Sequence, residues 1–217
     1  MKGLLLLDLD ETLIHSEEFP RTQPSIKDFD FKVVFEKENY WYMSKKRPFL
    51  EEFIKFAFEN FDVGVWTAST EDYATIVLEN IGIDKSKLKC FYTRENCGMR
   101  LDYETNSYYG VKNLQKLKKR SWVKPYTTKV GQIRELDRIL IVDDIADTAV
   151  NNRSNLILVK PFYFDDDDDT ELLKLISYLQ KIKDEPNYRT IDKRNWSRTT
   201  TGTTEEVITF TINSKSN

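Results

Sequence analysis

The sequence predicts an α/β fold with a parallel central sheet, and three observations support this class. The strands expected over 3–9, 63–66 and 138–142 contain short apolar runs, such as Leu4 to Leu7 and Ile139 to Val142, that are typical of strands buried on both faces. Stretches with helical spacing of apolar residues separate these runs, which is the pattern of strands joined by crossover helices. The runs end in polar side chains, and the carboxyl ends of parallel strands lie along one edge of a sheet. A functional site is therefore expected at that edge.

The elements follow one another along the chain. After the strand at 3–9, residues 31–35 and 40–43 predict a β hairpin inserted behind it. Residues 94–109 and the basic stretch 118–131 are expected to be loops. The remaining predicted elements are a helix from Arg47-Pro48 to Phe58, a strand over 63–66, a helix over 74–81 closed by Gly82, a strand over 88–92, a helix over 111–117, strands over 138–142 and 155–159, and a helix over 172–182.

Composition limits the class of protein. The 217 residues suffice for one domain over 1–183 and a polar extension over 184–217, in which 207–212 is a candidate late strand. A 40% apolar and 32% charged composition fits a folded protein with a core. The net charge of −3 argues against a nucleic-acid-binding scaffold, which is usually basic.

Two further features bear on location. Cys90 and Cys97 form no CxxC pair, and the chain has one histidine, so we expect reduced thiols and no zinc site. The leucine run at 4–7 is too short for a secretory leader or a membrane span. The sequence thus predicts a cytoplasmic or nuclear protein without a membrane partner, and it does not indicate an oligomeric state.

The first apolar run ends in two carboxylates and a hydroxyl, Asp8, Asp10 and Thr12. Desolvating an unpaired carboxylate is costly, so charge at this point needs a reason. One reading is a turn that caps a helix, because Asp and Thr do this well. The other is a DxDxT site for phosphoryl transfer. Thr67 after the next apolar run and Asp143-Asp144 after a later one favour the second reading, since helix caps do not require acidic pairs at two strand ends.

These residue types define a reaction. Asp8 would attack phosphorus and form an aspartyl phosphate. Asp10 would protonate the leaving oxygen and then deprotonate the attacking water. Crowded carboxylates need a cation, and hard oxygen ligands favour Mg²⁺. The expected ligands are the Asp8 carboxylate, the Asp10 backbone carbonyl, and Asp144 or Asp143. Thr67 and Lys112 are the candidates for binding the phosphoryl oxygens.

The chain resembles the haloacid dehalogenase superfamily and, within it, the phosphatases of the RNA polymerase II C-terminal domain (CTD). The matching motifs occur in the family's order over residues 3–183, and Glu11 favours this group over polynucleotide phosphatases, which usually carry Gly there. The motifs are Asp8-Leu9-Asp10-Glu11-Thr12-Leu13-Ile14-His15-Ser16, Lys46-Arg47-Pro48, Trp66-Thr67-Ala68-Ser69, Tyr73-Ala74, Arg94-Glu95-Asn96-Cys97, Val111-Lys112-Asn113-Leu114, Leu140-Ile141-Val142-Asp143-Asp144 and Asp169-Thr170-Glu171-Leu172.

The resemblance implies a three-layer Rossmann-like fold and a Mg²⁺-dependent protein serine/threonine phosphatase whose partner is a phosphorylated protein or peptide. It implies that Asp144 is the direct metal ligand and that Asp143 supports Lys112. It also implies that the insert over 19–45 is a small β element lining a peptide groove. The residues implied to bind substrate are Thr12, Ala68, Ser69, Tyr73 and Arg94.

Two other functions stay open on the same fold: a phosphatase of small metabolites or nucleotides, and a non-catalytic binding module like a mitochondrial import subunit. A closed cap would favour the first, and loss of the aspartates with a membrane span would favour the second. Among the remaining motifs, His15 is expected to be structural. The acidic run 165–169 lacks the spacing of a calcium loop and is expected to cap a helix. The basic residues of 118–124 are expected to form a solvated loop.

Overall fold

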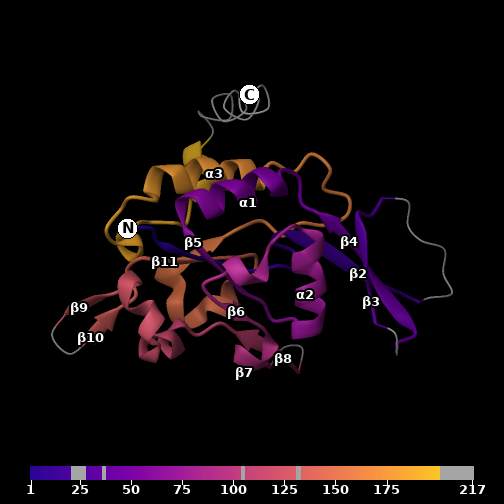
Figure 1. Ribbon diagram of the computed structural model, residues 1–217, viewed down its shortest axis with the longest axis horizontal. Coiled ribbons are helices and arrows are strands. Elements are labelled where there is room, and N and C mark those ends of the chain that lie inside the picture. Colours follow the sequence, from indigo (N-terminus) through magenta and orange to yellow (C-terminus); the bar gives the residue numbers. More distant parts are fainter. Residues whose placement is uncertain (21–27, 36–37, 104–105, 131–132, 201–217) are drawn as a thin grey trace.

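A computed structural model of the chain describes residues 1–20, 28–35, 38–103, 106–130 and 133–200. Its centre is a five-stranded sheet in which every neighbouring pair of strands is parallel (Figure 1). The strands, in the order β12-β11-β1-β5-β6 across the sheet, are Leu156–Leu158, Ile139–Asp143, Leu4–Leu7, Asp62–Trp66 and Phe91–Tyr92. The predicted α/β class with a parallel central sheet is confirmed.

The four leucines of β1 lie between two hydrophobic cores, which explains why the strand has no polar face. Leu5 and Leu7 join one core and Leu4 and Leu6 the other, and none is more than 1% exposed. Alternate residues of a strand point to opposite faces, so a central strand covered on both sides must be apolar throughout. The acidic residues that follow are therefore placed directly at the end of a fully buried strand.

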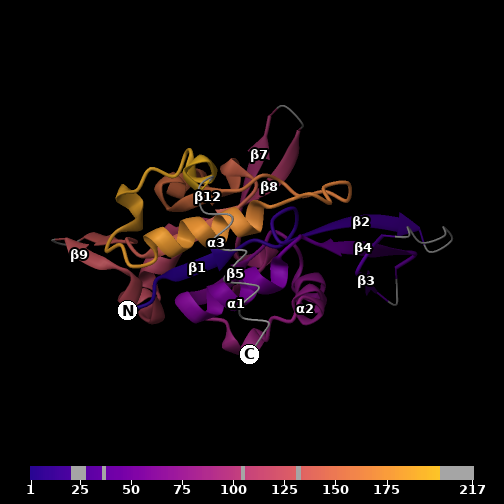
Figure 2. The ribbon, with the colours of Figure 1, turned by 90° about the horizontal axis from the view of Figure 1, so that it is seen from above.

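Helices cover both faces of the sheet. Side chains of α1 (Leu50–Asn60), α2 (Glu71–Asn80) and α3 (Glu171–Ile182) belong to the core that holds Leu5 and Leu7, and α1 and α3 lie side by side (Figures 1 and 2). The other core is covered by two short 3-10 helices, Leu114–Lys119 and Ser121–Tyr126.

The predicted helix over 111–117 is wrong in type and in bounds. Val111 ends a strand, and the following turns are 3-10 helices. Asn113 begins the first of these helices by accepting a hydrogen bond from the backbone N–H of Gln115, and Pro125 lies inside the second. An α-helix could not continue through that proline, because it lacks the N–H and its ring clashes with the preceding turn. The remaining 3-10 helices are Lys85–Lys87, Arg94–Asn96, Ala146–Asn155, Tyr188–Thr190 and Trp196–Thr200.

The insert after β1 is an antiparallel sheet of three strands in the order β2-β4-β3, at one end of the molecule beyond α2 (Figure 2). The strands are β2 (Ile14–Pro20), β3 (Phe31–Val34) and β4 (Tyr40–Lys46). The predicted hairpin corresponds to β3 and β4. The sequence missed β2, which pairs with β4 along its whole length and begins five residues before the predicted insert. Its alternation is interrupted because the consecutive residues Glu17 and Glu18, which point to opposite faces, are both exposed and charged.

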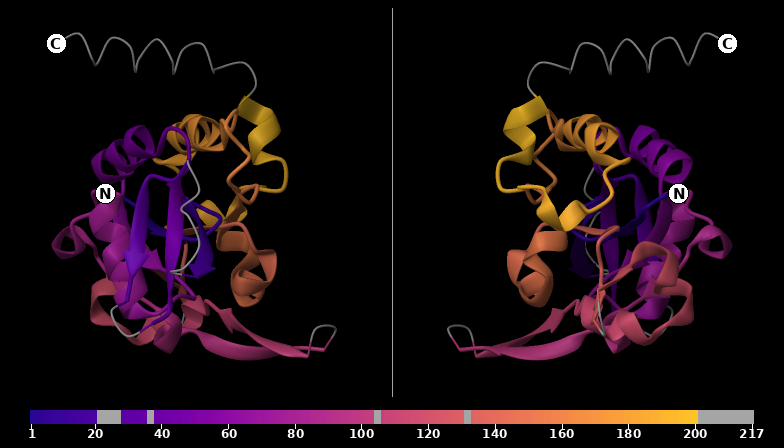
Figure 3. Two further views of the ribbon diagram at one scale, coloured as in Figure 1. Left: turned by 90° about the vertical axis from the view of Figure 1, so that its right-hand side faces the viewer. Right: turned by 90° about the vertical axis from the view of Figure 1, so that its left-hand side faces the viewer.

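The stretch predicted as a loop over 94–109 contains a hairpin. Strands β7 (Gly98–Asp102) and β8 (Ser107–Val111) pair antiparallel and project as an arm from the body (Figure 3). The arm buries little apolar surface, so its sequence lacks the hydrophobic alternation that predicts a strand. The predicted loop over 118–131 likewise contains the second 3-10 helix and β9 (Thr128–Val130), which pairs with β10 (Ile133–Glu135).

The start of the C-terminal extension packs on the domain. Tyr188 is fully buried, and Trp196 is 4% exposed and donates from its indole N–H to the carbonyl of Leu158 over 2.7 Å. The boundary at residue 183 stays a prediction, and the candidate strand over 207–212 lies outside the described residues. None of the helices in the described ranges has the length and apolar character needed to cross a bilayer.

Candidate active site

The acidic residues meet where the connection order of the sheet reverses. The chain builds the sheet from β1 to β5 and β6 on one side, then continues with β11 and β12 on the other side of β1. A crevice is expected outside the carboxyl ends of the two strands that flank such a reversal, here β1 and β11. Asp8 follows β1, Asp143 ends β11, and Asp144 comes next; one oxygen from each lies within 4.8 Å of the others.

Lys112 bridges this cluster. Its Nζ lies 2.8 Å from Asp8 Oδ1 and 2.6 Å from Asp143 Oδ2, and its side chain is fully buried. The backbone of Lys112 is held by the 3-10 helix after β11, because its N–H donates to the Thr148 carbonyl and its carbonyl accepts from Asn152. Burial disfavours the charged lysine, but Asp8 and Asp143 outweigh this and raise the pKa of Lys112.

The charge balance of the cluster fits a divalent cation. Burial raises the pKa of Asp8 and that of Asp144, the latter to about 6, and nearby carboxylates add to both shifts. With Lys112 charged, the carboxylates of Asp8, Asp143 and Asp144 leave two negative charges in excess. Carboxylate oxygens are the ligands that hard divalent cations prefer. Both oxygens of Asp143 already accept hydrogen bonds, Oδ2 from Lys112 and Thr148 and Oδ1 from the Ile145 backbone N–H. Lys112 contacts only Oδ1 of Asp8, so Asp8 and Asp144 are the better placed to hold such an ion.

Thr12 lies beneath the cluster rather than at a surface. Its side chain is fully buried, and its hydroxyl donates to Asp144 Oδ1 over 3.2 Å. The resemblance implied a substrate-binding role for Thr12. The geometry gives it a contact that orients the carboxylate of Asp144, and a role in substrate binding stays a prediction.

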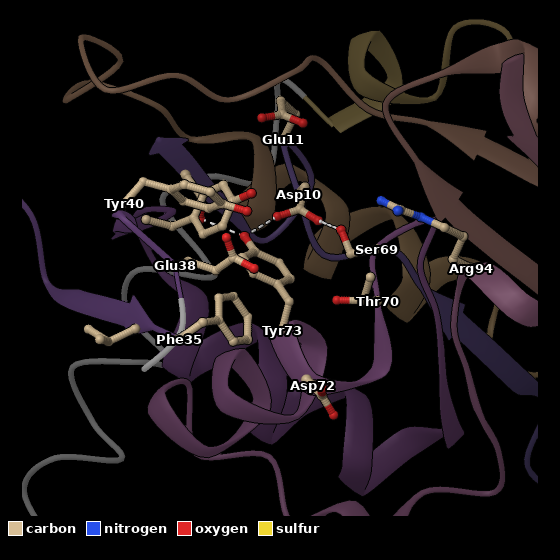
Figure 4. Close-up of a pocket in the computed structure, with 13 residues that line it drawn as sticks. Asp10, Glu11, Phe35, Glu38, Tyr40, Ser69, Thr70, Asp72, Tyr73 and Arg94 are labelled. Carbon is tan, nitrogen blue, oxygen red and sulfur yellow. Dashed lines mark hydrogen bonds between the residues drawn. The ribbon is translucent and has the colours of Figure 1, made fainter. Parts of the chain in front are cut away.

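Asp10 belongs to the same loop as Asp8 but has a different environment. Its Oδ2 accepts from the Ser69 hydroxyl over 2.6 Å, and its Oδ1 accepts from the Tyr73 hydroxyl over 2.5 Å (Figure 4). Burial raises the pKa of Asp10, and these two hydrogen bonds oppose the shift. Glu11, the next residue, has a φ of 54°, so the loop turns sharply here through the left-handed region. The carboxylates of Asp8 and Asp10 thus have separate sets of partners.

A line of hydroxyl groups continues from Asp10 into the inserted sheet. Tyr73 Oη lies 2.7 Å from Ser16 Oγ, which lies 2.8 Å from Ser44 Oγ. A phenol has one proton, and the Asp10 carboxylate can only accept, so the Ser16 hydroxyl donates to Tyr73. Ser16 of β2 lies in the first of the matching motifs but was given no role there, and Ser44 of β4 shows no pattern that could have identified it.

Thr67 stands at the end of β5, next to β1. It is 1% exposed, and its Oγ1 accepts from the Ser69 backbone N–H over 3.0 Å, so its own proton remains free to be donated. Arg94 is exposed on the other side of Asp10 and donates from Nε to the Ala68 carbonyl over 3.0 Å (Figure 4). The structure thus brings Ala68, Ser69, Tyr73 and Arg94 together around Asp10.

An open cavity of about 860 Å³ extends from Asp10 between α2 and the inserted sheet. Aromatic side chains of the insert and of α2 line it, including Phe35, Tyr40, Tyr42 and Tyr73 (Figure 4). Its open shape suits an extended chain better than a small metabolite, which binds in a pocket that encloses most of its surface.

The other motifs have structural contacts. His15 is 7% exposed and lies between Glu11 and Glu17, at 2.9 and 3.4 Å. In the acidic run, Asp169 accepts from the backbone N–H of Glu171 at the start of α3, as a helix cap does. The sequence did not reveal a second contact of Asp169, a buried ion pair with Arg47. Thr148 was also missed; its Oγ1 lies 2.8 Å from Asp143 Oδ2.

Residues 3–189 match the family described as NLI interacting factor-like phosphatase. The chain is 35% identical over 196 residues to a CTD phosphatase-like protein of Invertebrate iridescent virus 3, covering 84% of this chain and 97% of that protein. It is 28% identical over 199 residues to CTD nuclear envelope phosphatase 1B of Danio rerio, covering 89% of this chain and 72% of that protein.

Among solved structures, the fold is similar to that of a variant of the fission yeast RNA polymerase II CTD phosphatase Fcp1 bound to beryllium fluoride. The TM-score is 0.53 at 16% identity, and the match covers 94% of this chain and 63% of that one. At this identity the likeness concerns the fold alone.

Proposed function

Because this chain belongs to the NLI interacting factor-like phosphatase family, we propose that it removes phosphate from phosphoserine and phosphothreonine of a protein, with Asp8 as nucleophile and Asp10 as acid and base. One observation carries the proposal: two carboxylates of one loop have separate environments. Asp8 contacts the Lys112 ammonium, whereas Asp10 contacts two hydroxyl groups at the edge of a groove. Pairs of acids in unlike environments are the usual arrangement for dividing nucleophile and acid roles.

The first step forms a bond between an Asp8 carboxylate oxygen and phosphorus while the bond from phosphorus to the serine oxygen breaks. The half-buried Asp10, whose pKa is raised, gives its proton to the departing serine oxygen. In the second step, water attacks phosphorus, Asp10 takes back a proton from that water, and the Asp8–phosphorus bond breaks. Lys112 and the Thr67 hydroxyl, both buried at this edge, would bind the phosphoryl oxygens.

A divalent cation completes the proposed site. The Asp8 and Asp144 carboxylates and the Asp10 backbone carbonyl would hold it, with Asp143 fixing Lys112. We propose Mg²⁺, which prefers oxygen ligands and would neutralise charge on the phosphoryl group when bound.

The groove supports a protein substrate over a metabolite. The insert stands beside the catalytic edge and leaves a cavity open along α2, whereas a metabolite phosphatase would enclose its ligand. We also propose a cytoplasmic or nuclear location, supported by the free thiols Cys90 and Cys97.

The proposal is tested with p-nitrophenyl phosphate and a panel of phosphopeptides, nucleotides and sugar phosphates, each assayed with Mg²⁺ and with EDTA. We expect hydrolysis that requires Mg²⁺, is lost in Asp8→Asn, and is fastest on phosphopeptides. Full activity of Asp8→Asn would contradict the mechanism, and equal rates on all substrates would contradict the protein substrate.

A further inference from the structure

The wall of the groove next to Asp10 is a cluster of tyrosines. The rings of Tyr40 and Tyr42 meet edge to face with centroids 5.6 Å apart, and those of Tyr42 and Tyr73 do so at 5.3 Å. Phe35 lines the same cavity, and Figure 4 shows it beside Tyr73. The Tyr73 hydroxyl reaches Asp10, so this aromatic wall begins at the proposed acid and base.

The same end of the groove is acidic. Glu38 lines the cavity with the aromatic rings, and Figure 4 shows its carboxylate between the insert and Tyr73. Asp72 also lines the cavity, at the start of α2 and apart from Glu38 (Figure 4). The Tyr42 hydroxyl donates to Glu18 over 3.4 Å, which adds a third carboxylate nearby. In the part of the chain that the structure describes, no salt bridge engages Glu38 or Asp72.

Positive charge is confined to the far side of the groove. Arg94 is the cationic residue among the described residues lining the cavity, and it lies across Asp10 from the tyrosines (Figure 4). The groove is therefore polarised, with Arg94 on one side of the catalytic carboxylate and an aromatic, acidic end on the other.

We propose that this aromatic, acidic end binds a lysine or arginine side chain of the substrate, close in sequence to the phosphorylated residue. The inference rests on the proposed function and adds a substrate preference to it. The faces of tyrosine rings attract cations, and the Glu38 carboxylate beside them would pair with the charged head. Asp72 adds negative charge to the same cavity. A neutral side chain such as proline would use the rings but gain nothing from the carboxylates. A second phosphate or an acidic residue would be repelled.

The cation must lie near the phosphoserine in the sequence. Tyr73 contacts both Asp10 and Tyr42, so one side chain spans the distance from the catalytic loop to the tyrosine wall. An extended chain advances about 3.3 Å per residue, which places the basic residue within about three positions of the phosphoserine.

The test uses a series of phosphoserine peptides that are otherwise neutral. Each peptide carries a single lysine or a single glutamate, placed at one of the positions up to about four residues before or after the phosphoserine. The value of kcat/KM is measured for each peptide. Lysine at positions on one side of the phosphoserine is expected to raise kcat/KM about tenfold, mainly through a lower KM, and glutamate there to reduce it.

Charge reversal then tests which residues carry the preference. In the double variant Glu38→Lys with Asp72→Lys, the ratio of kcat/KM between the lysine and glutamate peptides is expected to invert. The matched control is Glu59→Lys with Glu79→Lys, which changes the net charge equally at exposed positions of α1 and α2 outside the cavity. This control is expected to keep the wild-type ratio. Comparing two peptides within each variant cancels any change in overall activity.

The proposed cation site would be overturned if the wild-type protein had equal kcat/KM for the lysine and glutamate peptides at every position. It would also be overturned if both double variants changed the ratio of these two kcat/KM values equally. Failure of the phosphatase proposal itself would look different, as loss of hydrolysis of all peptides and of p-nitrophenyl phosphate. In that case the affinities of the Asp8→Asn variant for the same peptides test the cation site alone. We expect tighter binding of the lysine peptide, and equal Kd values would refute it.

Discussion

Tyr73 shows how a single side chain links the proposed chemistry to the groove. Its hydroxyl donates to Asp10 and its ring forms part of the aromatic wall. Burial and the Asp10 carboxylate raise the pKa of Tyr73, so the phenol keeps its proton and remains a donor to Asp10. The tyrosine is therefore placed to hold the orientation of the acid and base.

We predict that Tyr73→Phe lowers kcat about tenfold on a phosphoserine peptide and less on p-nitrophenyl phosphate. A serine alkoxide is a poor leaving group that needs a proton from Asp10, whereas nitrophenolate leaves without one. Steady-state kinetics on both substrates measure the difference, with Tyr178→Phe as a control at another buried tyrosine. An equal loss on both substrates would show that Tyr73 does not act through Asp10.

His15 makes a separate, pH-dependent contribution to stability. Burial alone would lower its pKa, but its contacts with Glu11 and Glu17 outweigh this and raise the pKa above the usual value. A raised pKa in the folded state means that the folded protein binds the proton more tightly than the unfolded chain does. The stabilisation is therefore present in full below the unfolded pKa and is lost as the pH rises through the folded pKa.

We predict that His15→Gln lowers the free energy of unfolding more at pH 5 than at pH 9, values that bracket the usual pKa of about 6.5. Urea denaturation of both proteins across this range measures the difference. A difference that stays constant, or that grows with pH, would contradict the assigned contacts.

The sequence identified Asp8, Asp10 and Asp143-Asp144 because each follows an apolar strand in a motif with fixed spacing. It did not identify Ser16, Ser44 or the hydrogen bond from Thr12 to Asp144. These contacts join β2, β4, α2 and two strand ends, so they depend on how the elements pack rather than on any local pattern.

Among the elements, a buried arginine fixes the catalytic loop to the start of α3. Arg47 donates from Nε and Nη2 to Asp169 over 3.0 and 2.9 Å, from Nη1 to the Thr12 carbonyl over 3.0 Å, and from Nη2 to the Lys160 carbonyl over 2.7 Å. Its side chain has no exposed surface. Three segments distant in the sequence therefore depend on one guanidinium.

We predict that Arg47→Met lowers the free energy of unfolding by ~3–5 kcal/mol, because it leaves the buried Asp169 carboxylate without its partner. The matched control is Lys45→Met, whose partner Asp167 is 80% exposed, and which we expect to cost less than ~1 kcal/mol. Denaturant unfolding of both variants measures the two losses. Equal losses would mean that burial of the Arg47 pair has no special effect.

Helices and strands were predicted correctly where apolar residues recur at the regular spacing of a helix or form an uninterrupted run. The strands of the central sheet and the three α-helices bury one or both faces, so their patterns are clear in the sequence. Prediction failed for β7 and β8, whose side chains are largely exposed, and for residues 111–117, where apolar residues at spacings of three resemble a helix but form the end of β8 and a 3-10 helix. It also failed for Ser121–Tyr126, a 3-10 helix that was predicted as part of a loop.

For the whole molecule, the order of the central sheet determines where the chemistry can occur. Residues as distant as Asp8 and Asp144 meet because β1 and β11 are neighbours at the point where the sheet reverses its connection order. The alternation of strands and helices predicted a parallel sheet but not the order of its strands. The rule that parallel strands end at one edge was enough to group these carboxylates, but the neighbourhood of β1 and β11 is known only from the structure.

We predict that EDTA abolishes phosphatase activity and that Mg²⁺ restores it. Asp144→Asn should require at least about tenfold more Mg²⁺ for half-maximal activity, because an amide oxygen carries no charge to offset that of the ion. Asp147→Asn is the control, since Asp147 is exposed and pairs with Arg153 outside the cluster. Activity that survives EDTA, or equal Mg²⁺ requirements in both variants, would contradict the proposed ligand set.

The central claim is that phosphate passes through a covalent bond to Asp8, and the most direct measurement is to trap that bond. The protein is mixed with a rapidly cleaved phosphomonoester, quenched in acid and analysed by peptide mass mapping. The account predicts one added phosphoryl group on the peptide that contains Asp8, labile to hydroxylamine and absent from Asp8→Asn. Rapid turnover without any phosphorylated enzyme, or a phosphoryl group on another residue, would contradict it.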